Sequence, residues 1–202
     1  MPADHYRTPA ALAEITQKIE RSEFLGLVFP VSSEEAFFEE LQRIEKKYFD
    51  ATHHCWAFRL WGGRTRSSDA GEPSGTAGKP ILSAIEGADL YDCGVVVVRW
   101  YGGVKLGTGG LSRAYRETAA EALRATPLLD RYVYVRFRLE VPFEILGTVY
   151  RFVAPPDVVL VAENFGESNT FDFDVRESTA EKFGAMLTEK RIRWQLAVGR
   201  GQ

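Results

Sequence analysis

The chain has 202 residues, of which 45% are hydrophobic and 26% charged, and its formal net charge is -3 at pH 7. This length allows one large domain or two small ones, each able to bury a core. The mild negative charge excludes a strongly cationic protein that coats nucleic acid or anionic lipid without selectivity. Two cysteines, Cys55 and Cys93, are too few for a disulfide framework and favour a reducing, cytoplasmic location. No apolar run approaches the ~20 residues of a spanning helix, so we expect no membrane association.

The first two-thirds of the chain alternates strand-like and helix-like segments. Strands are predicted at residues 24–31, 53–61 and 94–101, and helices at 33–48, 81–85 and 111–125. The last of these helices is amphipathic, with Leu111, Tyr115 and Ala119 on one face and charged side chains on the other. This alternation predicts a two-layer α/β sandwich domain over residues 1–128.

After a boundary at residues 126–130, the pattern changes to βαββαβ. Alternating apolar residues predict strands at 133–141, 171–175 and 192–198, a continuous apolar run predicts one at 158–161, and 164–169 supplies a hairpin turn. Apolar residues at helical spacing predict a helix within 145–153, and Ser178 is expected to cap a second one. We therefore expect a second two-layer sandwich, a ferredoxin-like domain over residues 131–202, and an α+β protein of two domains.

Glycine is concentrated in one part of the chain. Twelve of the 18 glycines lie between Gly62 and Gly110, which indicates tight turns or a surface where a ligand meets bare backbone. Residues 53–116 also contain eight Lys or Arg against five Asp or Glu, a balance opposite in sign to that of the whole chain. The balance fits a cationic face in this region, although charges that solvate separate loops would produce it equally well.

The glycine-rich segment 105–115 leads directly into the third predicted helix. Backbone N–H groups at a helix start favour an anion, and nearby Lys and Arg side chains add charge-assisted hydrogen bonds to phosphate. Neither the P-loop pattern nor the dinucleotide-binding glycine pattern is present. The candidate ligand or phosphate-binding residues are Ser74, Gly75, Thr76, Arg99, Lys105, Gly107, Thr108, Gly109, Gly110 and Arg113.

The other glycine-rich loop, residues 67–80, combines carboxylates and hydroxyl groups. Asp69, Glu72 and the nearby His54 are candidate catalytic residues, and the two carboxylates could hold Mg²⁺ if the protein is an enzyme. The alternative is that these polar side chains only stabilise turns, which we favour. His53 and His54 point to opposite faces of a strand, so we expect no zinc site and no resident cofactor.

Three long motifs, in this order, resemble the Impact/YigZ family, a group of proposed translation regulators. They are His-His-Cys-Trp-Ala-Phe at 53–58, Gly-Glu-Pro-Ser-Gly-Thr-Ala-Gly at 71–78, and the segment 94–107 with its continuation through Arg113. The resemblance implies a first domain like a small-subunit ribosomal protein domain, with a left-handed βαβ crossover, and a ferredoxin-like second domain. Glu23 and Ala70 depart from the family pattern, and Ala70 weakens the case for a paired-carboxylate catalyst.

Three functions follow from these observations. The first is a translation regulator that binds RNA or a ribosome-associated protein through the glycine-rich, locally basic surface of the first domain, with no DNA specificity inferred. The second is a phosphoester hydrolase or transferase that acts on a phosphorylated small molecule. The third is a protein-interaction module without nucleic acid.

Overall fold

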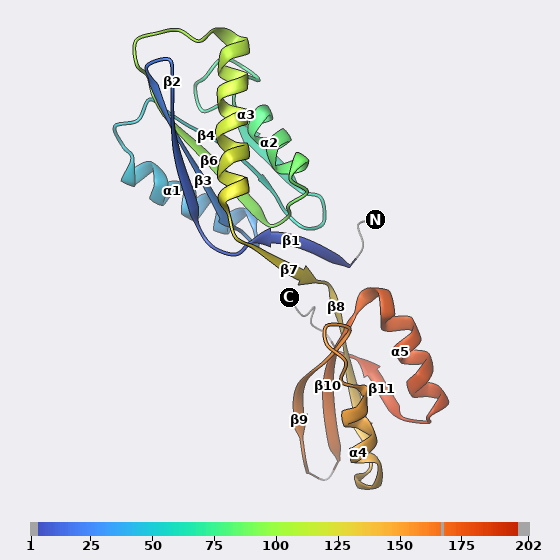
Figure 1. The fold of residues 1–202 in the computed structure, drawn as a ribbon. Coiled ribbons are helices and arrows are strands. Elements are labelled where there is room, and N and C mark those ends of the chain that lie inside the picture. The colour runs from blue at the N-terminus through green and yellow to red at the C-terminus, as the bar shows by residue number, and fades with distance from the viewer. Residues whose placement is uncertain (1–3, 167, 198–202) are drawn as a thin grey trace. The chain divides into compact units, whose positions relative to one another are not determined.

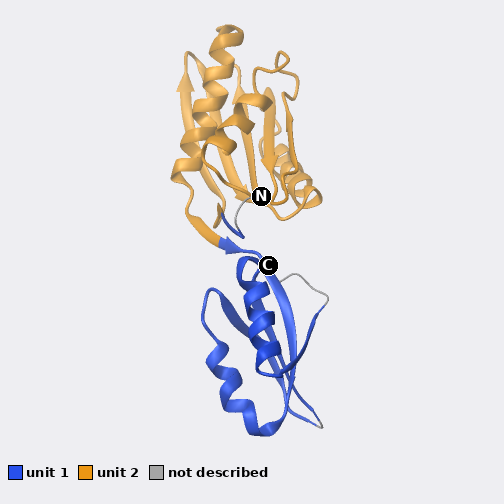
Figure 2. Cartoon of the chain, turned by 90° about the vertical axis from the view of Figure 1, so that its right-hand side faces the viewer, with its two compact units in different colours: residues 1–6, 131–202 blue, residues 7–130 orange. Residues whose placement is uncertain are grey.

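The computed structural model describes residues 4–166 and 168–197, and the chain divides into two compact units, coloured separately in Figure 2. The larger unit is Arg7–Asp130, and the smaller combines Met1–Tyr6 with Arg131–Gln202. A two-stranded sheet pairs β1 (His5–Pro9) with β7 (Leu128–Tyr132), the two segments in which the chain passes from one unit to the other. Among the described residues, no helix is long and apolar enough to cross a membrane.

The larger unit contains a five-stranded sheet in which every neighbouring pair is antiparallel. The strand order is β2-β3-β6-β4-β5, with bounds Ala13–Ile19, Ser22–Pro30, Cys93–Trp100, His53–Arg59 and Thr65–Ser68 respectively. Strands β3 and β4 flank β6, so the connection through α1 (Glu34–Lys47) crosses over the central strand.

Helices cover both faces of this sheet. Val96 and Val98 of β6 pack in a cluster with α1, whereas Val95 and Val97 pack in a cluster with α2 (Gly78–Gly87) and α3 (Gly107–Ala125). Figure 1 shows α2 and α3 together on the face opposite α1. The unit therefore has three layers, one more than the sequence predicted. A continuous apolar run such as residues 95–98 is typical of a strand buried on both faces. This run was the sequence feature that could have indicated the third layer.

The glycine-rich segments are more regular than predicted. Helix α3 begins at Gly107 and α2 at Gly78, four and three residues before the predicted starts. Because glycine has low helix propensity, the pattern of side chains alone placed these residues in loops. Strands β2 and β5 were also not predicted. In β2 the inner face is only half-buried and polar Gln17 interrupts the apolar alternation that would indicate a strand.

The smaller unit has the predicted βαββαβ order. Its antiparallel sheet runs β11-β8-β10-β9, with bounds Arg193–Leu196, Tyr134–Val141, Asn169–Arg176 and Val158–Asn164. Helix α5 (Glu177–Glu189) and the short α4 (Leu146–Val149), which 3-10 turns flank, pack with one sheet face around Phe137, Phe171 and Phe173. The ferredoxin-like prediction is confirmed, although Val198, predicted to end the last strand, lies outside the described residues.

The start of α5 differs from the sequence prediction. Ser178 lies inside the helix, and its backbone N–H donates to Asp4 Oδ2 at 2.8 Å, so the carboxylate of a distant residue serves the helix start. Asp4 also accepts hydrogen bonds from Arg176, at 2.7 Å from Nη2 and 3.3 Å from Nε. These contacts group residues 4–6 with the smaller unit, whereas the sequence placed them in the first domain.

Candidate functional site

Asp69 of the first glycine-rich loop directly follows β5 and is the first residue of the segment between β5 and α2. Its carboxylate accepts hydrogen bonds from the backbone N–H groups of Gly75, Ala77 and Gly78, at 2.8, 2.9 and 2.8 Å. Burial acts to raise the pKa of Asp69, but these three hydrogen bonds outweigh it and hold the pKa below its ordinary value. The amides that could receive an external anion are thus already bound to a carboxylate of the same loop.

Glu72, in the same loop, is buried against the sheet and α3. Its Oε1 lies 2.6 Å from Arg99 Nη1 and 2.7 Å from the hydroxyl of Tyr115, which donates to it. Arg99 Nη2 also donates to Ser22 Oγ at 3.2 Å, and Arg99 itself is 4% exposed. These contacts join the loop to β3, β6 and α3 through one buried polar cluster. The side chain of Arg99, which the sequence predicted to hold phosphate, is therefore bound within the chain.

The histidines and Cys55 of β4 lie at the margin of this cluster. His53 Nδ1 is 3.0 Å from the carbonyl of Ala70, and its Nε2 is 3.9 Å from Glu72 Oε2. His54 Nε2 faces the carbonyl of Tyr48 instead, so the two rings diverge as strand geometry predicts. Cys55 Sγ donates to the carbonyl of Asp69 at 3.0 Å. Within residues 4–166 and 168–197, no group of three or more His, Cys, Asp or Glu side chains has a metal-binding arrangement.

The second glycine-rich segment presents exposed backbone at the start of α3. Gly107, Thr108 and Gly109 are exposed, and the helix begins after Leu106 without a side-chain capping hydrogen bond and without an acidic residue in its first turn. Gly107 has a φ of 69°, a conformation that glycine adopts without strain. No side chain therefore caps the N–H groups of this first turn.

Lys105 and Arg113 line a single groove beside this helix start, with a volume of about 480 Å³. Both side chains are exposed, and Gly110 also lines the groove. The remaining wall carries Glu20 from the β2–β3 turn and Glu117 from the next turn of α3, which the sequence reasoning did not find. Glu117 was discoverable from its helical spacing to Arg113, whereas Glu20 is distant in sequence and gave no signal.

The structure therefore separates the predicted ligand-binding residues into two groups. Lys105, Gly110 and Arg113 line one groove at the start of α3, next to the exposed residues 107–109. Ser74, Gly75 and Thr76 belong to the loop that binds Asp69, and Arg99 is buried beside Glu72. None of the residues 67–80 lines the groove of Lys105 and Arg113. The arrangement suits binding of a phosphate at α3, and it engages both carboxylate oxygens of Asp69 and the Oε1 atom of Glu72 in contacts within the chain.

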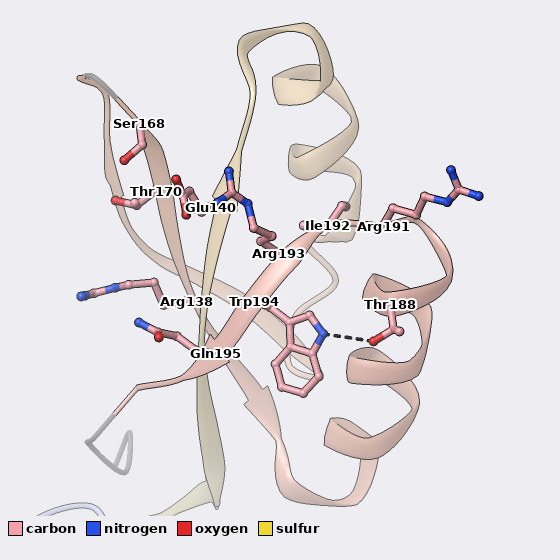
Figure 3. Close-up of a pocket in the computed structure, with 10 residues that line it drawn as sticks. All are labelled: Arg138, Glu140, Ser168, Thr170, Thr188, Arg191, Ile192, Arg193, Trp194 and Gln195. Atoms are coloured by element: carbon pink, nitrogen blue, oxygen red, sulfur yellow. Dashed lines mark hydrogen bonds and ion pairs between the residues drawn. The ribbon is translucent and has the colours of Figure 1, made fainter.

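A larger groove of about 690 Å³ lies at β11 of the smaller unit (Figure 3). The indole of Trp194 points toward α5 and donates to Thr188 Oγ1 at 3.2 Å. Two of the three arginines that line the groove are paired: Arg138 makes two hydrogen bonds to Asp172, at 2.7 and 2.6 Å, and Arg193 lies 3.5 Å from Glu140. This pairing makes it a weaker candidate for an anion than the start of α3.

Comparison with known proteins identifies the family of the chain. Residues 20–123, which contain both glycine-rich segments, match the model of the Impact N-terminal domain. The chain belongs to the Impact family. A family member from Haemophilus influenzae is 34% identical over 190 residues, which cover 92% of each chain. The family member YigZ from Escherichia coli is 39% identical over 121 residues, 57% of this chain and 59% of YigZ.

A solved structure supports the fold assignment over nearly the whole chain. A crystal structure described as that of a hypothetical protein has a TM-score of 0.68 and 26% sequence identity, and the match covers 97% of this chain and 98% of the other. The resemblance to the Impact/YigZ family is confirmed, and so is the two-domain α+β architecture that it implied.

Proposed function

We propose that this Impact-family chain regulates translation, and that the groove at the start of α3 binds the phosphate backbone of RNA. Two features support the proposal: the family is one of proposed translation regulators, and α3 of the larger unit begins without a side-chain cap beside two exposed cations. Translation takes place in the cytosol, so the proposal implies a cytoplasmic location, in keeping with the two free cysteines.

The observation that carries the proposal is the position of Lys105 and Arg113 in one groove beside the uncapped start of α3. Exposed N–H groups at a helix start and two cations supply hydrogen-bond donors and positive charge for a phosphate, and the two cations offset the carboxylates of Glu20 and Glu117 in the same groove. The contrast with the first loop is instructive, since there a carboxylate of the chain already accepts the amide hydrogen bonds.

The geometry favours binding over catalysis. Both carboxylate oxygens of Asp69 accept hydrogen bonds from backbone amides, and Glu72 Oε1 accepts from Arg99 and Tyr115, whereas Glu72 Oε2 lies 3.9 Å from His53 Nε2. A general base or a metal ligand needs a carboxylate oxygen directed to the substrate or the ion. A phosphate on α3 requires no rearrangement of either residue.

Salt-dependent binding to a single-stranded RNA oligonucleotide tests the proposal. The variants Lys105→Ala and Arg113→Ala should each weaken binding, and each lost phosphate contact should reduce the slope of log K against log salt by about 0.7. Lys46→Ala, which removes an exposed cation from α1 on the opposite sheet face, is the matched control and should leave binding unchanged. Unaltered binding in both groove variants, or no binding by the wild-type chain at low salt, contradicts the proposal.

A further inference from the structure

A second groove in the larger unit lies between α2 and α3, with a volume of about 370 Å³. Figure 1 shows the two helices side by side on the same face of the sheet. The floor of the groove is aliphatic and mostly small: Ala84, Leu90 and Leu123 are buried, Ala88 and Ala120 are half-buried, and the more exposed Leu128 also lines the groove. Ala84 lies one turn before Ala88, the C-cap of α2, and Ala120 lies one turn before Leu123 on α3, so the floor follows the helices for about one turn.

The rim of this groove is cationic. Arg7, Arg116 and Arg124 line it, and no Asp or Glu is among the described residues that do. The side chain of Arg116 makes no hydrogen bond or ion pair with another described residue. Arg7 Nη2 donates to the carbonyl of Ala88 at 3.2 Å, and Arg124 Nη2 lies 3.6 Å from Glu121 Oε1, in a pair with both side chains at least half exposed. Such an exposed pair contributes little energy, so Arg124 remains available to a partner.

Helix α3 contributes side chains to both grooves. Arg116, Ala120, Leu123 and Arg124 follow helical spacing along the groove, whereas Glu117 lines the separate groove of Lys105. The two grooves share no lining residue. The surface between α2 and α3 therefore combines an aliphatic floor with an arginine rim, and it is distinct from the surface proposed to bind RNA.

We infer that the groove between α2 and α3 docks an acidic amphipathic helix of a partner protein. A helix with apolar residues at positions i, i+3, i+4 and i+7 fits a groove between two helices, and the small floor residues allow its backbone to approach closely. Carboxylates beside those anchors meet the three arginines, which gives the complex its charge complementarity. The groove is less suited to RNA bases, because none of its described lining residues is aromatic.

The test uses the full chain and two synthetic helical peptides of about 18 residues, or five turns. Both carry leucine at i, i+3, i+4 and i+7 spacing, one with glutamate and the other with lysine at the flanking positions. Binding is measured by fluorescence anisotropy, and the contact surface is mapped by ¹H–¹⁵N shift changes. We expect the acidic peptide to bind, the basic peptide not to bind, and the shift changes to centre on α2 and α3.

Charge reversal distinguishes docking in this groove from non-specific attraction. The variant Arg116→Glu/Arg124→Glu should weaken binding of the acidic peptide by about tenfold or more. The control Lys46→Glu/Lys47→Glu makes the same change in net charge at the exposed end of α1, on the other side of the sheet. It should change the affinity for the acidic peptide by no more than about twofold. If the double arginine variant fails to fold, Arg116→Gln/Arg124→Gln replaces it, with a smaller loss in the same direction.

The inference is overturned if the acidic peptide does not bind, or if the acidic and basic peptides bind equally well. It is also overturned if the shift changes lie outside α2 and α3, or if the arginine and lysine variants lose equal affinity for the acidic peptide. Shift changes of α2 and α3 with a single-stranded RNA, in place of the acidic peptide, would assign the groove to nucleic acid instead.

Discussion

Glu72 of the first glycine-rich loop and Arg99 of β6 form a buried ion pair, with Oε1 and Nη1 2.6 Å apart and both side chains at most 5% exposed. The pair anchors a loop of small and polar residues to the central strand of the sheet. Tyr115 adds a hydrogen bond from α3 to the same carboxylate oxygen. Removal of one partner leaves the other as an unpaired buried charge, which is why the pair is sensitive to single substitutions.

The variant Glu72→Ala should lower the free energy of unfolding of the larger unit by about 3–5 kcal/mol, because Arg99 is left without its counter-ion. Tyr115→Phe keeps the ion pair and removes one hydrogen bond, so a loss of about 1 kcal/mol is expected. Urea denaturation measures both. The double variant Glu72→Leu/Arg99→Met should be more stable than Glu72→Ala, since it removes both charges. A loss below about 1 kcal/mol for Glu72→Ala would mean that the ion pair does not anchor the loop.

The two ends of α2 should respond in opposite ways to a glycine-to-alanine change. At Gly78 an added Cβ would lie 2.7–2.9 Å from backbone atoms of Ser68, so Gly78→Ala should destabilise the larger unit by about 1–3 kcal/mol. At Gly87 nothing lies within 4 Å of the added atom, and Gly87→Ala should be neutral or stabilise by up to about 1 kcal/mol. Thermal unfolding of the two variants provides the comparison, and equal effects would contradict the close approach at Ser68.

Asp4 should make the smaller unit sensitive to acid. Burial acts to raise the pKa of Asp4, but hydrogen bonds from Arg176 and Ser178 outweigh it and lower the pKa to about 2, from a usual value of 3.8. A carboxyl group whose pKa is lower in the folded state than in the unfolded state stabilises the fold at pH values above its unfolded-state pKa. This contribution is lost as the pH falls through the folded-state pKa. The contribution, about 2 kcal/mol, should disappear between about pH 5 and pH 2.

Trp194 is the one tryptophan of the smaller unit, so its indole ¹H–¹⁵N signal reports the unfolding of that unit in urea at each pH. In Asp4→Asn the stability of the smaller unit should be lower at neutral pH and should vary less across the acidic range. An Asp4→Asn variant with the same pH dependence as the wild-type chain would assign the acid sensitivity to other carboxylates.

Both thiols should be unreactive in the folded protein. Burial raises the pKa of Cys55 to about 12, and it raises the pKa of fully buried Cys93 well above its usual range. Because the thiolate is the reactive species, alkylation at mildly alkaline pH should be slow in the native state and rapid in denaturant. Mass spectrometry of the alkylated chain checks this expectation, and rapid native labelling of Cys55 would contradict the packing of β4 against the loop at Asp69.

The sequence by itself determined the elements whose side chains repeat regularly. The alternation along residues 133–141 and 171–175 predicted the ferredoxin-like sheet, and the amphipathic pattern after Leu111 predicted most of α3. It also placed Lys105 and Arg113 beside the start of a helix, because a glycine-rich turn before an amphipathic segment is a local signal. The motifs of the glycine-rich region were sufficient to indicate the family.

Only the tertiary structure decided which polar groups are already bound within the chain. The sequence treated Asp69, Glu72 and Arg99 as residues that could face a ligand, whereas the fold directs Asp69 to the amides of its own loop and pairs Glu72 with Arg99 across 27 positions. The contact between Asp4 and Ser178 spans 174 positions. Such partners are distant in the chain. They are shielded from competing hydrogen bonds with water only when the sheet and helices have assembled and buried them. For that reason the phosphate-binding hypothesis narrows from ten residues, on two glycine-rich segments and the strand and helix beside them, to the residues at the start of α3.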